Sequence, residues 1–507
     1  MDSLKKRYSY KLITNFVGFS ISMITAGIVP RALGVENFGV FNYITTIFRQ
    51  ILDFLDARTS TCFYVNLSQN PNEKNIYLFY SRYIVYAGFV FLVIISICAF
   101  TPVHNFLLKG HSSTIFYVAA GYCFFTWVSE IIIYIMDAHG YTVTLEKIRF
   151  ANKILSTAIL LLLFANNTIN LTTYFIYLYG ILFVLIISLI IYLIKIGTFP
   201  SSFWASGKGD LKKYSGTFLK YSFPMLGYMG ICTLLTVAER WMLQHFGGSH
   251  EQGIYSFSYT FMNFSYLFLT AIQPLVMREI SVAFSQNNIL RIGDLYHKTY
   301  PLLFAITAFI CAYIFIEAES IVSFFGGTAY KSSVISLRIF MINPLIYVFS
   351  GMNTSILFAT NRTKLLFKMV ICFVPINIVL LFILLSPSML HLGALGYVIK
   401  NNFMELISVI IILFYLSKKI KINAFKCIFH FLYIIPFLFG SFAASKISNL
   451  LCLNIHPVGH FLISGFIYSI IIGGIAYTIP RCLGFSENPI KLIAIKIQEM
   501  VRTKLQS

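Results

Sequence analysis

The sequence predicts an all-α polytopic membrane protein with about 14 transmembrane helices. Of the 507 residues, 58% are hydrophobic and only 11% are charged, whereas soluble domains average roughly 45 to 50% apolar and about 25% charged residues. Apolar runs close to the ~20 residues that cross a bilayer recur along the whole chain. Short segments between these runs hold most of the lysines and arginines. This balance excludes a water-soluble fold.

Apolar runs bounded by turn or charge signals define the predicted helices. A first group of spans lies near 12–30, 38–62, 76–100, 114–136, 149–165 and 171–194. A second group lies near 217–238, 254–276, 300–325, 333–358, 366–386 and 393–416, and a final pair near 428–445 and 460–480. The grouping predicts an N-lobe over 1–194, a cytoplasmic inter-lobe loop over 195–216, a C-lobe over 217–416, and the last two spans with a basic cytoplasmic tail over 417–507.

Lysine and arginine predict the orientation of these spans. Cytoplasmic loops of membrane proteins retain an excess of both residues. If the N-terminus is cytoplasmic, most of the 38 basic residues fall in inner segments, from Lys5, Lys6 and Arg7 to the C-terminal tail. This count predicts an even number of spans with both termini in the cytoplasm. The net charge of +20 then reflects topology, and nucleic acid is not expected as a partner.

Two glycine-containing phrases suggest an internal repeat. After the first span the chain reads PRALGVENFGVFNY, and after the seventh ERWMLQHFGGSHEQGIYSFSY. In each, Arg31 or Arg240 precedes an acidic turn and then Gly39 or Gly253. A related phrase, FFGGTAY, lies between spans nine and ten. Internal repeats are common in transporters, so the phrases predict two related halves, unless such turns simply join neighbouring helices at the membrane interface.

Span two carries a polar helical face. Its members recur at helical spacing and are Asn42, Thr45, Thr46, Arg49, Asp53, Asp56 and Ser60. Facing lipid, its three charged residues would together cost ~7 to 10 kcal/mol. The face is therefore expected to line a water-filled cavity. The alternative is that Arg49 and Asp53 form an internal ion pair that only locks helix packing.

The PRALGVENFGVF phrase resembles the signature of polysaccharide flippases, the Wzx-type O-antigen translocases of the multidrug/oligosaccharidyl-lipid/polysaccharide (MOP) exporter superfamily. YSFPML, AERWML, QGIYSFSY and FFGGTAY are similar to that family's pattern in the second lobe. The resemblance implies two six-helix lobes around a central cationic cavity and two further helices at the C-terminus. It also implies a multi-pass protein of the bacterial inner membrane.

The implied activity is transport, without a cofactor. A lipid-linked oligosaccharide on undecaprenyl diphosphate, such as the repeat unit of lipopolysaccharide O-antigen, is expected to move by alternating access from the cytoplasmic to the periplasmic leaflet. Membrane lipid and other enzymes of polysaccharide assembly are the further expected partners.

Five cations are predicted to bind the diphosphate in the cavity, since guanidinium groups meet phosphate oxygens with paired hydrogen bonds and lysine acts as a point charge. These substrate-binding candidates are Arg31, Arg49, Arg240, Arg338 and Lys400. For those near span ends, the alternative is snorkelling at the membrane interface.

Energy for transport is expected from an ion gradient, because no GxxxxGK[ST] phrase for ATP occurs in the chain. The carboxyl candidates for proton or sodium coupling are Asp53, Asp56, Glu130 and Glu405. Glu405 could equally pair with Lys400 or accept a hydrogen bond from Asn401. No metal site is expected, since the nine cysteines include no CxxC and the histidines do not converge.

Two other classes stay open. A lipid II flippase or a drug exporter of the same superfamily is the closer alternative, although drug exporters usually resemble twelve spans. A membrane-embedded polysaccharide polymerase or glycosyltransferase is the other. The short predicted outer loops, which contain no DxD phrase, disfavour an enzyme.

Overall fold

The computed structural model describes residues 4–71, 73–101, 106–107, 112–197, 208–360, 362–420, 422–451 and 457–484. All regular structure in these ranges is helical, and they contain no strand. Nine of the helices described are long and apolar enough to cross a membrane, or ten if the bent α8 is included. The predicted all-α multi-pass class is confirmed. Each predicted span overlaps a helix, and the count of about 14 stays a prediction.

The chain forms two compact units, Met1–Gly253 and Ile254–Ser507. The helices of the first unit are α1 (Leu4–Asp56), α2 (Thr59–Gln69), α3 (Lys74–Phe100), α5 (Ser113–Ala138), α6 (Thr142–Ala165), α7 (Leu171–Lys195) and most of α8 (Lys208–Ser265). The boundary falls inside α8, so the seventh predicted span packs with the first unit. The four-part division drawn from the sequence stays a prediction.

Aromatic side chains form the core of the first unit. α1 packs against α5 and α6, and α5 packs against α7. Buried Phe48 of α1 meets Phe91 of α3 and Phe116 of α5, with ring centroids 6.2 and 5.7 Å apart. Edge-to-face and tilted ring pairs at such distances are favourable. The polar residues of α1 are therefore held on a helix whose opposite face is anchored.

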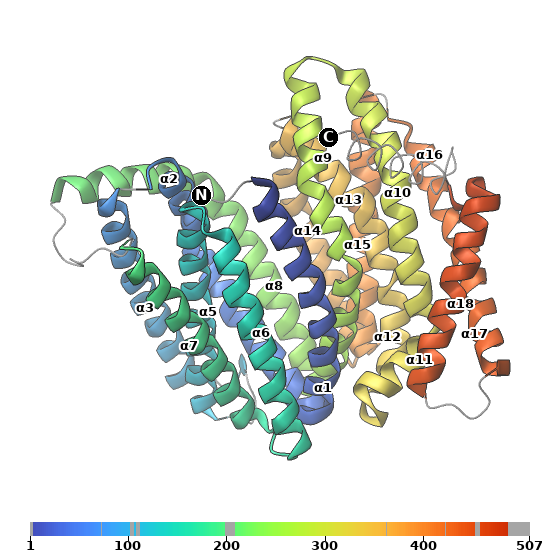
Figure 1. Cartoon of the computed structure of the whole chain (residues 1–507), viewed down its shortest axis with the longest axis horizontal. Coiled ribbons are helices and arrows are strands. Elements are labelled where there is room, and N and C mark those ends of the chain that lie inside the picture. The colour runs from blue at the N-terminus through green and yellow to red at the C-terminus, as the bar shows by residue number, and fades with distance from the viewer. Residues whose placement is uncertain are drawn as a thin grey trace, which may run out of the picture. The chain divides into compact units, whose positions relative to one another are not determined.

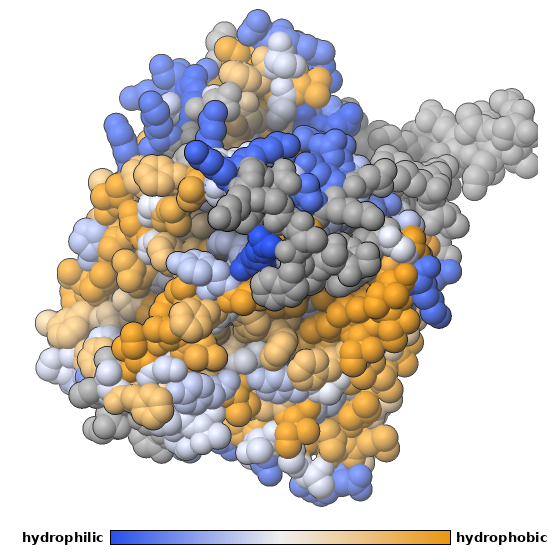
Figure 2. Space-filling model, turned by 90° about the vertical axis from the view of Figure 1, so that its left-hand side faces the viewer, coloured by the Kyte–Doolittle hydropathy of each residue, from blue (hydrophilic) through white to orange (hydrophobic). Residues whose placement is uncertain are grey.

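The outer faces of the first unit are apolar. On α3 and α7, the side chains of Phe89 and Ile176 are 65% and 66% exposed. Figure 1 shows α3, α5 and α7 running side by side, and Figure 2 shows a broad hydrophobic band on one face of the molecule, with hydrophilic side chains gathered toward one end. Large apolar surface of this extent fits contact with lipid.

The second unit begins within α8 and is also helical. Its further elements are α9 (Leu267–Ser285), α10 (Ile289–Ile316), α11 (Ala318–Ile321), the π turn Val322–Gly326, the 3-10 turn Thr328–Tyr330, α12 (Ser333–Phe340), α13 (Ile342–Ala359), α14 (Thr363–Leu385), α15 (Gly393–Ile420), α16 (Ala424–Phe429), the 3-10 turn His430–Ile434, α17 (Ile435–Leu451), α18 (Pro457–Thr478) and the 3-10 turn Pro480–Leu483. α13 packs against α9, α10 and α15, while α17 and α18 pack on each other and on α10.

Span two differs from the single helix that the sequence predicts over 38–62. α1 ends at Asp56, and Ala57 and Arg58 adopt positive φ of 43° and 65° before α2 begins. The buried Asp56 carboxylate accepts hydrogen bonds from the Ser60 backbone N–H at 3.1 Å and the Ser60 hydroxyl at 2.7 Å. Side chains that bond to nearby backbone N–H groups favour such helix starts. Ser60 therefore belongs to a different helix from Arg49.

The glycine phrases share one backbone conformation. Gly34, Gly248 and Gly327 have φ/ψ of 74°/169°, 70°/−173° and 72°/−166°, a region that is essentially restricted to glycine. This geometry aligns Gly34 with Gly248, so Arg31, three residues before the first glycine, does not correspond to Arg240, eight residues before the second. The phrases thus share a backbone conformation, and on this alignment Arg31 and Arg240 are not equivalent positions. The repeat of two related halves stays a prediction.

Two predicted regions fall largely outside the described residues. They are the centre of the inter-lobe loop, 198–207, and the basic tail from 485 onward.

Candidate functional site

Arg49 lies in a three-residue charge cluster in the first unit. Its Nη1 and Nη2 donate to the two carboxylate oxygens of Glu130 on α5 at 2.8 and 2.7 Å, and its Nε donates to Asp53 at 3.0 Å. The side chains are 34% exposed for Arg49 and Asp53 and 40% for Glu130. Such a two-pronged arginine–carboxylate pair combines strong hydrogen bonds with a defined geometry.

The cluster carries a net negative charge. One guanidinium and two ionised carboxylates sum to −1, so the arginine is held by anions in this state. The structure thus brings together three residues that the sequence singled out separately, and the Arg49–Asp53 pair at i,i+4 is one of the two arrangements considered for span two. All three side chains are partly exposed in the structure, and the water-filled cavity expected along this face stays a prediction.

Asp56 has a set of hydrogen-bond partners different from that of the Arg49 cluster. Besides Ser60, it accepts from the Thr59 hydroxyl at 3.1 Å and the Tyr80 hydroxyl at 3.3 Å, and it is 7% exposed. Four donors satisfy a carboxylate well. The contacts around Asp56 are those of a residue that fixes the junction between α1 and α2.

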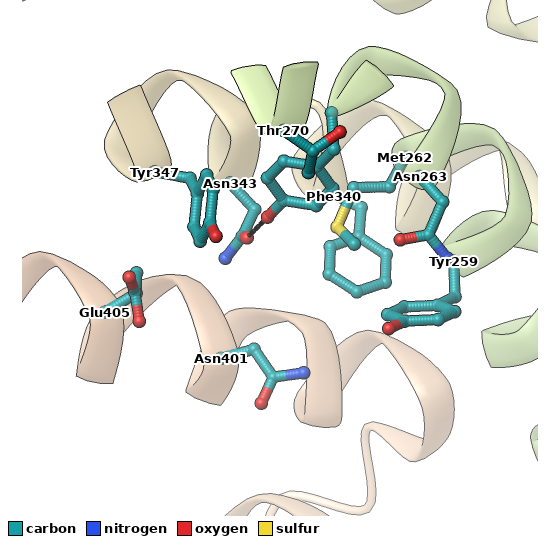
Figure 3. Close-up of a pocket in the computed structure, with 10 residues that line it drawn as sticks. Tyr259, Met262, Asn263, Thr270, Phe340, Asn343, Tyr347, Asn401 and Glu405 are labelled. Carbon is teal, nitrogen blue, oxygen red and sulfur yellow. Dashed lines mark hydrogen bonds between the residues drawn. The ribbon is translucent and has the colours of Figure 1, made fainter. Parts of the chain in front are cut away.

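The second unit contains a polar and aromatic pocket of about 420 Å³. Its walls come from α8, α9, α12, α13 and α15, and Figure 3 shows Asn401 and Glu405 projecting from α15 toward the side chains opposite. The lining residues are Tyr259, Met262, Asn263, Tyr266, Thr270, Phe340, Asn343, Tyr347, Asn401 and Glu405. A pocket of ~300 to 1,000 Å³ with apolar walls and a few convergent polar groups is typical of a small-molecule site.

Hydrogen bonds behind the pocket hold its amides in place. The Tyr266 hydroxyl donates to Asn343 Oδ1, as the dashed line in Figure 3 indicates. Asn343 Nδ2 donates to Asn402 at 2.9 Å, and Asn402 Nδ2 donates to the Ile339 carbonyl at 2.7 Å. Asn401 Nδ2 donates to the Tyr255 hydroxyl at 3.1 Å. Side chains locked in this way present their remaining groups at defined positions.

Two helix interruptions border the pocket. α8 passes into α9 at Tyr266, and α12 passes into α13 at Met341, directly beside the lining residues Tyr266, Phe340 and Asn343. Discontinuous transmembrane helices commonly form the substrate sites of transporters. The sequence analysis treated each of these stretches as one uninterrupted span.

The other predicted cations lie in separate local environments. Arg31 is exposed and lines a cavity of about 280 Å³ with Phe164 and Asn167. Arg240 is buried, and its Nη1 donates to Gln252 at 3.1 Å.

In the second unit, Arg338 donates to Glu319 at 3.0 Å and to the Phe315 carbonyl at 3.2 Å. The Lys400 ammonium lies 5.0 Å from the centroid of the Tyr397 ring, and the residue is 2% exposed. A joint cationic cavity stays a prediction.

Among the pocket residues, the sequence singles out only Glu405 as a site candidate, with Asn401 as its possible hydrogen-bond donor. A usable signal existed, because Tyr259, Asn263 and Tyr266 recur at offsets of four and seven, as do Asn343 with Tyr347 and Asn401 with Glu405 at four. These are helical-face spacings. Tyrosine and asparagine carry no charge, however. The large free-energy cost that marks a charged side chain inside the membrane therefore did not single them out. Within the described residues, no three His, Cys, Asp or Glu side chains are grouped to hold a metal ion.

No protein-family model matches the chain, and no curated protein matches it in sequence. Solved structures do match. The lipid II flippase MurJ, in an inward closed conformation, has a TM-score of 0.65 at 17% identity, over 92% of this chain and 98% of MurJ. An inward-facing multidrug resistance transporter of the MATE family, MOP superfamily, has a TM-score of 0.57 at 13% identity, over 80% of this chain and 94% of that one.

A MOP superfamily transporter from Pyrococcus furiosus has a TM-score of 0.53 at 12% identity, over 82% of this chain and 96% of that transporter. The identities are low and the coverage is nearly complete on the side of each known structure. The chain therefore has the fold of the MOP-superfamily transporters along almost its whole described length.

Proposed function

We propose that this chain is a flippase that carries a lipid-linked oligosaccharide from the cytoplasmic to the outer leaflet of a bacterial inner membrane. The observation that carries the proposal is the similarity of fold to the lipid II flippase MurJ over 92% of the chain, together with a polar pocket among apolar helices. A lipid with a sugar headgroup needs both a membrane-embedded path and polar contacts along it.

Arg49 is the proposed contact for the diphosphate. In the structure, Glu130 and Asp53 occupy its N–H groups. A diphosphate offers oxygen acceptors of the same geometry with greater negative charge. The diphosphate of the substrate therefore displaces the two carboxylates from the Arg49 guanidinium. This displacement links substrate binding to ion coupling.

Glu130 and Asp53 are the proposed coupling groups. Protonation of either carboxylate weakens its hold on Arg49 and leaves the guanidinium available to phosphate. Both are partly exposed, so protons can reach them. Asp56, with four donors and little exposure, has a structural role in this scheme. The energy source in this scheme is a proton or sodium gradient.

Export of cationic drugs is the second candidate. The acidic character of both sites favours it, since Glu405 is the charged residue lining the pocket and the Arg49 cluster has a net charge of −1. A MATE-family transporter also shares the fold. An acidic site attracts an organic cation and repels a diphosphate unless the carboxylates are protonated or displaced.

Reconstitution separates the two candidates. The purified chain is placed in liposomes with undecaprenyl-diphosphate-linked oligosaccharide, and an added glycosidase reports the fraction of glycan on the outer leaflet over time. We expect protein-dependent exposure of glycan that responds to an imposed pH or sodium gradient. Ethidium efflux from the same liposomes is the parallel measurement.

The test variant is Arg49→Gln, which removes the guanidinium. The control is Arg278→Gln. The side chain of Arg278 is 76% exposed, and its described ion pair is with Glu279. Glycan exposure should fall with Arg49→Gln and persist with Arg278→Gln. Gradient-driven ethidium efflux without any glycan exposure would instead identify a drug exporter.

A further inference from the structure

The pocket of the second unit has the wrong charge for a diphosphate. Among its described lining residues there is no lysine, arginine or histidine, and one carboxylate, Glu405, is present. Lys400 is adjacent to Asn401 in the sequence, but its ammonium lies over the Tyr397 ring, and it is not a lining residue. Diphosphate oxygens placed here would meet a like charge without a compensating cation.

We infer that this pocket binds a sugar ring of the transported glycan, and that Glu405 selects neutral or amino sugars there against acidic ones. The inference rests on the proposed function, because it assigns part of the same substrate to a second site. The diphosphate and the glycan would then be recognised by different groups of residues, Arg49 with its carboxylates for the former and the pocket for the latter.

The aromatic walls suit the apolar faces of a sugar ring. Tyr259, Tyr347 and Phe340 present rings to the cavity from three different helices. The face of an aromatic ring carries partial negative charge, and the C–H groups on one side of a pyranose carry partial positive charge. Tyr259 is 39% exposed, so its ring is accessible to a ligand without repacking of the unit.

The polar walls suit hydroxyl groups. Asn263, Asn343 and Asn401 supply amides, and amides both donate and accept hydrogen bonds, as sugar hydroxyls do. Asn343 is held by Tyr266 and Asn402, and Asn401 by Tyr255. Fixed amides of this kind favour one orientation of a ligand, because little side-chain freedom is lost on binding.

Glu405 supplies the discrimination. Its carboxylate accepts hydrogen bonds from hydroxyls and can pair with the ammonium of an amino sugar. A hexuronate would bring a second carboxylate into the same cavity, where two like charges close together repel. A repulsive element of this sort is a common basis of specificity.

The test measures binding of free sugars, independently of transport. Full-length protein in nanodiscs is titrated with the methyl glycosides of galactose, N-acetylglucosamine, glucosamine and glucuronic acid, with saturation-transfer NMR as the readout. We expect binding of the first three and at least about tenfold weaker binding of the glucuronide, as expected for juxtaposed like charges. Glu405→Gln should remove this discrimination while neutral sugars still bind.

Three further variants localise the signal to the pocket. Tyr259→Ala should abolish sugar binding, whereas Phe403→Ala, which removes an exposed aromatic of α15 that lines a different, apolar cavity, should not. Glu319→Gln, which neutralises the exposed partner of Arg338, should leave the discrimination against glucuronide intact.

Equal binding of glucuronide and galactoside by the unmodified protein would overturn the inference. It would also be overturned if the protein bound no sugar and instead bound Na⁺ saturably in a way that depends on Glu405. Either result leaves glycan exposure in liposomes unaffected, so it is distinguishable from failure of the flippase proposal. Conversely, sugar discrimination without glycan exposure in liposomes would reject the flippase function and keep the subsite.

Discussion

At the scale of single residues, the Arg49 guanidinium binds two carboxylates at once. Its guanidinium has donors directed at both Glu130 and Asp53, and both ion pairs are only partly buried. Ion pairs with this exposure contribute little net stability, because solvent screens them. The arrangement is therefore better suited to exchange of partners than to holding the fold together.

Replacement of Glu130 tests this exchange. Glu130→Gln removes one of the two negative charges and changes the net charge of the cluster from −1 to 0. We expect tighter binding of the diphosphate-linked substrate, because its competitor for Arg49 is weakened, together with loss of the response of glycan exposure to a pH gradient. The measurements are substrate affinity in nanodiscs and gradient-dependent exposure in liposomes.

The control for this variant is Glu279→Gln, since Glu279 pairs with Arg278 and Arg291 on the surface of the second unit. It should change neither affinity nor the gradient response. A Glu130→Gln protein that keeps its full response to the pH gradient would remove Glu130 from coupling and return the Arg49 pair to a packing role.

At the scale of helices, glycines decide how α1 and α8 meet. A Cβ on Gly39 would lie 1.9 Å from the carbonyl oxygen of Ser249, and a Cβ on Gly253 would lie 2.1 Å from the carbonyl oxygen of Val35. Val35 and Ser249 each follow a glycine at which the helix breaks, so the contact is reciprocal. The backbone just after Gly34 therefore packs against Gly253, and the backbone just after Gly248 packs against Gly39.

Gly253→Ala is expected to force this crossing apart, because backbone atoms at 2.1 Å cannot move aside as a flexible side chain can. The expected result is a melting temperature in detergent several degrees lower and loss of most glycan exposure in liposomes. Fluorescence-detected thermal unfolding measures the first effect.

Two other glycines separate packing from backbone strain. Gly34→Ala meets nothing within 4 Å but must adopt φ of +74°, which costs about 1 to 3 kcal/mol. Gly227→Ala, with open space around it and ordinary helical φ, should be neutral or slightly stabilising. If Gly253→Ala unfolds no earlier than Gly227→Ala, the close crossing is not required for stability.

At the scale of the whole molecule, each unit is an independent bundle with its own aromatic core. In the second unit the last two helices are joined to α10, where the Tyr468 hydroxyl donates to the Phe309 carbonyl at 3.0 Å and the two rings stack at 4.7 Å. The helices of the final pair of predicted spans thus pack within the second unit.

The orientation predicted from lysine and arginine can be tested by cysteine labelling. In a background without the nine native cysteines, Asn166→Cys and Ser388→Cys lie in exposed loops predicted to face outward, whereas Asn70→Cys and Gln286→Cys lie in exposed loops predicted to face the cytoplasm. An impermeant maleimide added to intact cells should label only the first two.

Labelling of all four after permeabilisation is the control for reactivity. If the two pairs instead exchange their accessibility, both termini are outside, and the direction of transport assigned here must be reversed.

The sequence by itself determined the features that depend on neighbours along the chain. Hydrophobic runs determined where helices lie, because the bilayer requires backbone groups to bond within each segment. The spacing of Arg49 and Asp53 already placed both on one polar helical face, and the glycine phrases fell between predicted spans. Each of these signals is carried by residues within a few turns of one another.

Only the tertiary structure decided which distant residues meet. Glu130 lies 81 residues from Arg49. The pocket combines uncharged tyrosines and asparagines from several helices, and their local spacing does not state which helices come together. The carboxylate of Asp56, at the end of α1, likewise accepts a hydrogen bond from Tyr80 of α3, 24 residues away. Helical periodicity states which face of a helix is polar, but the partner of that face follows from how the helices pack.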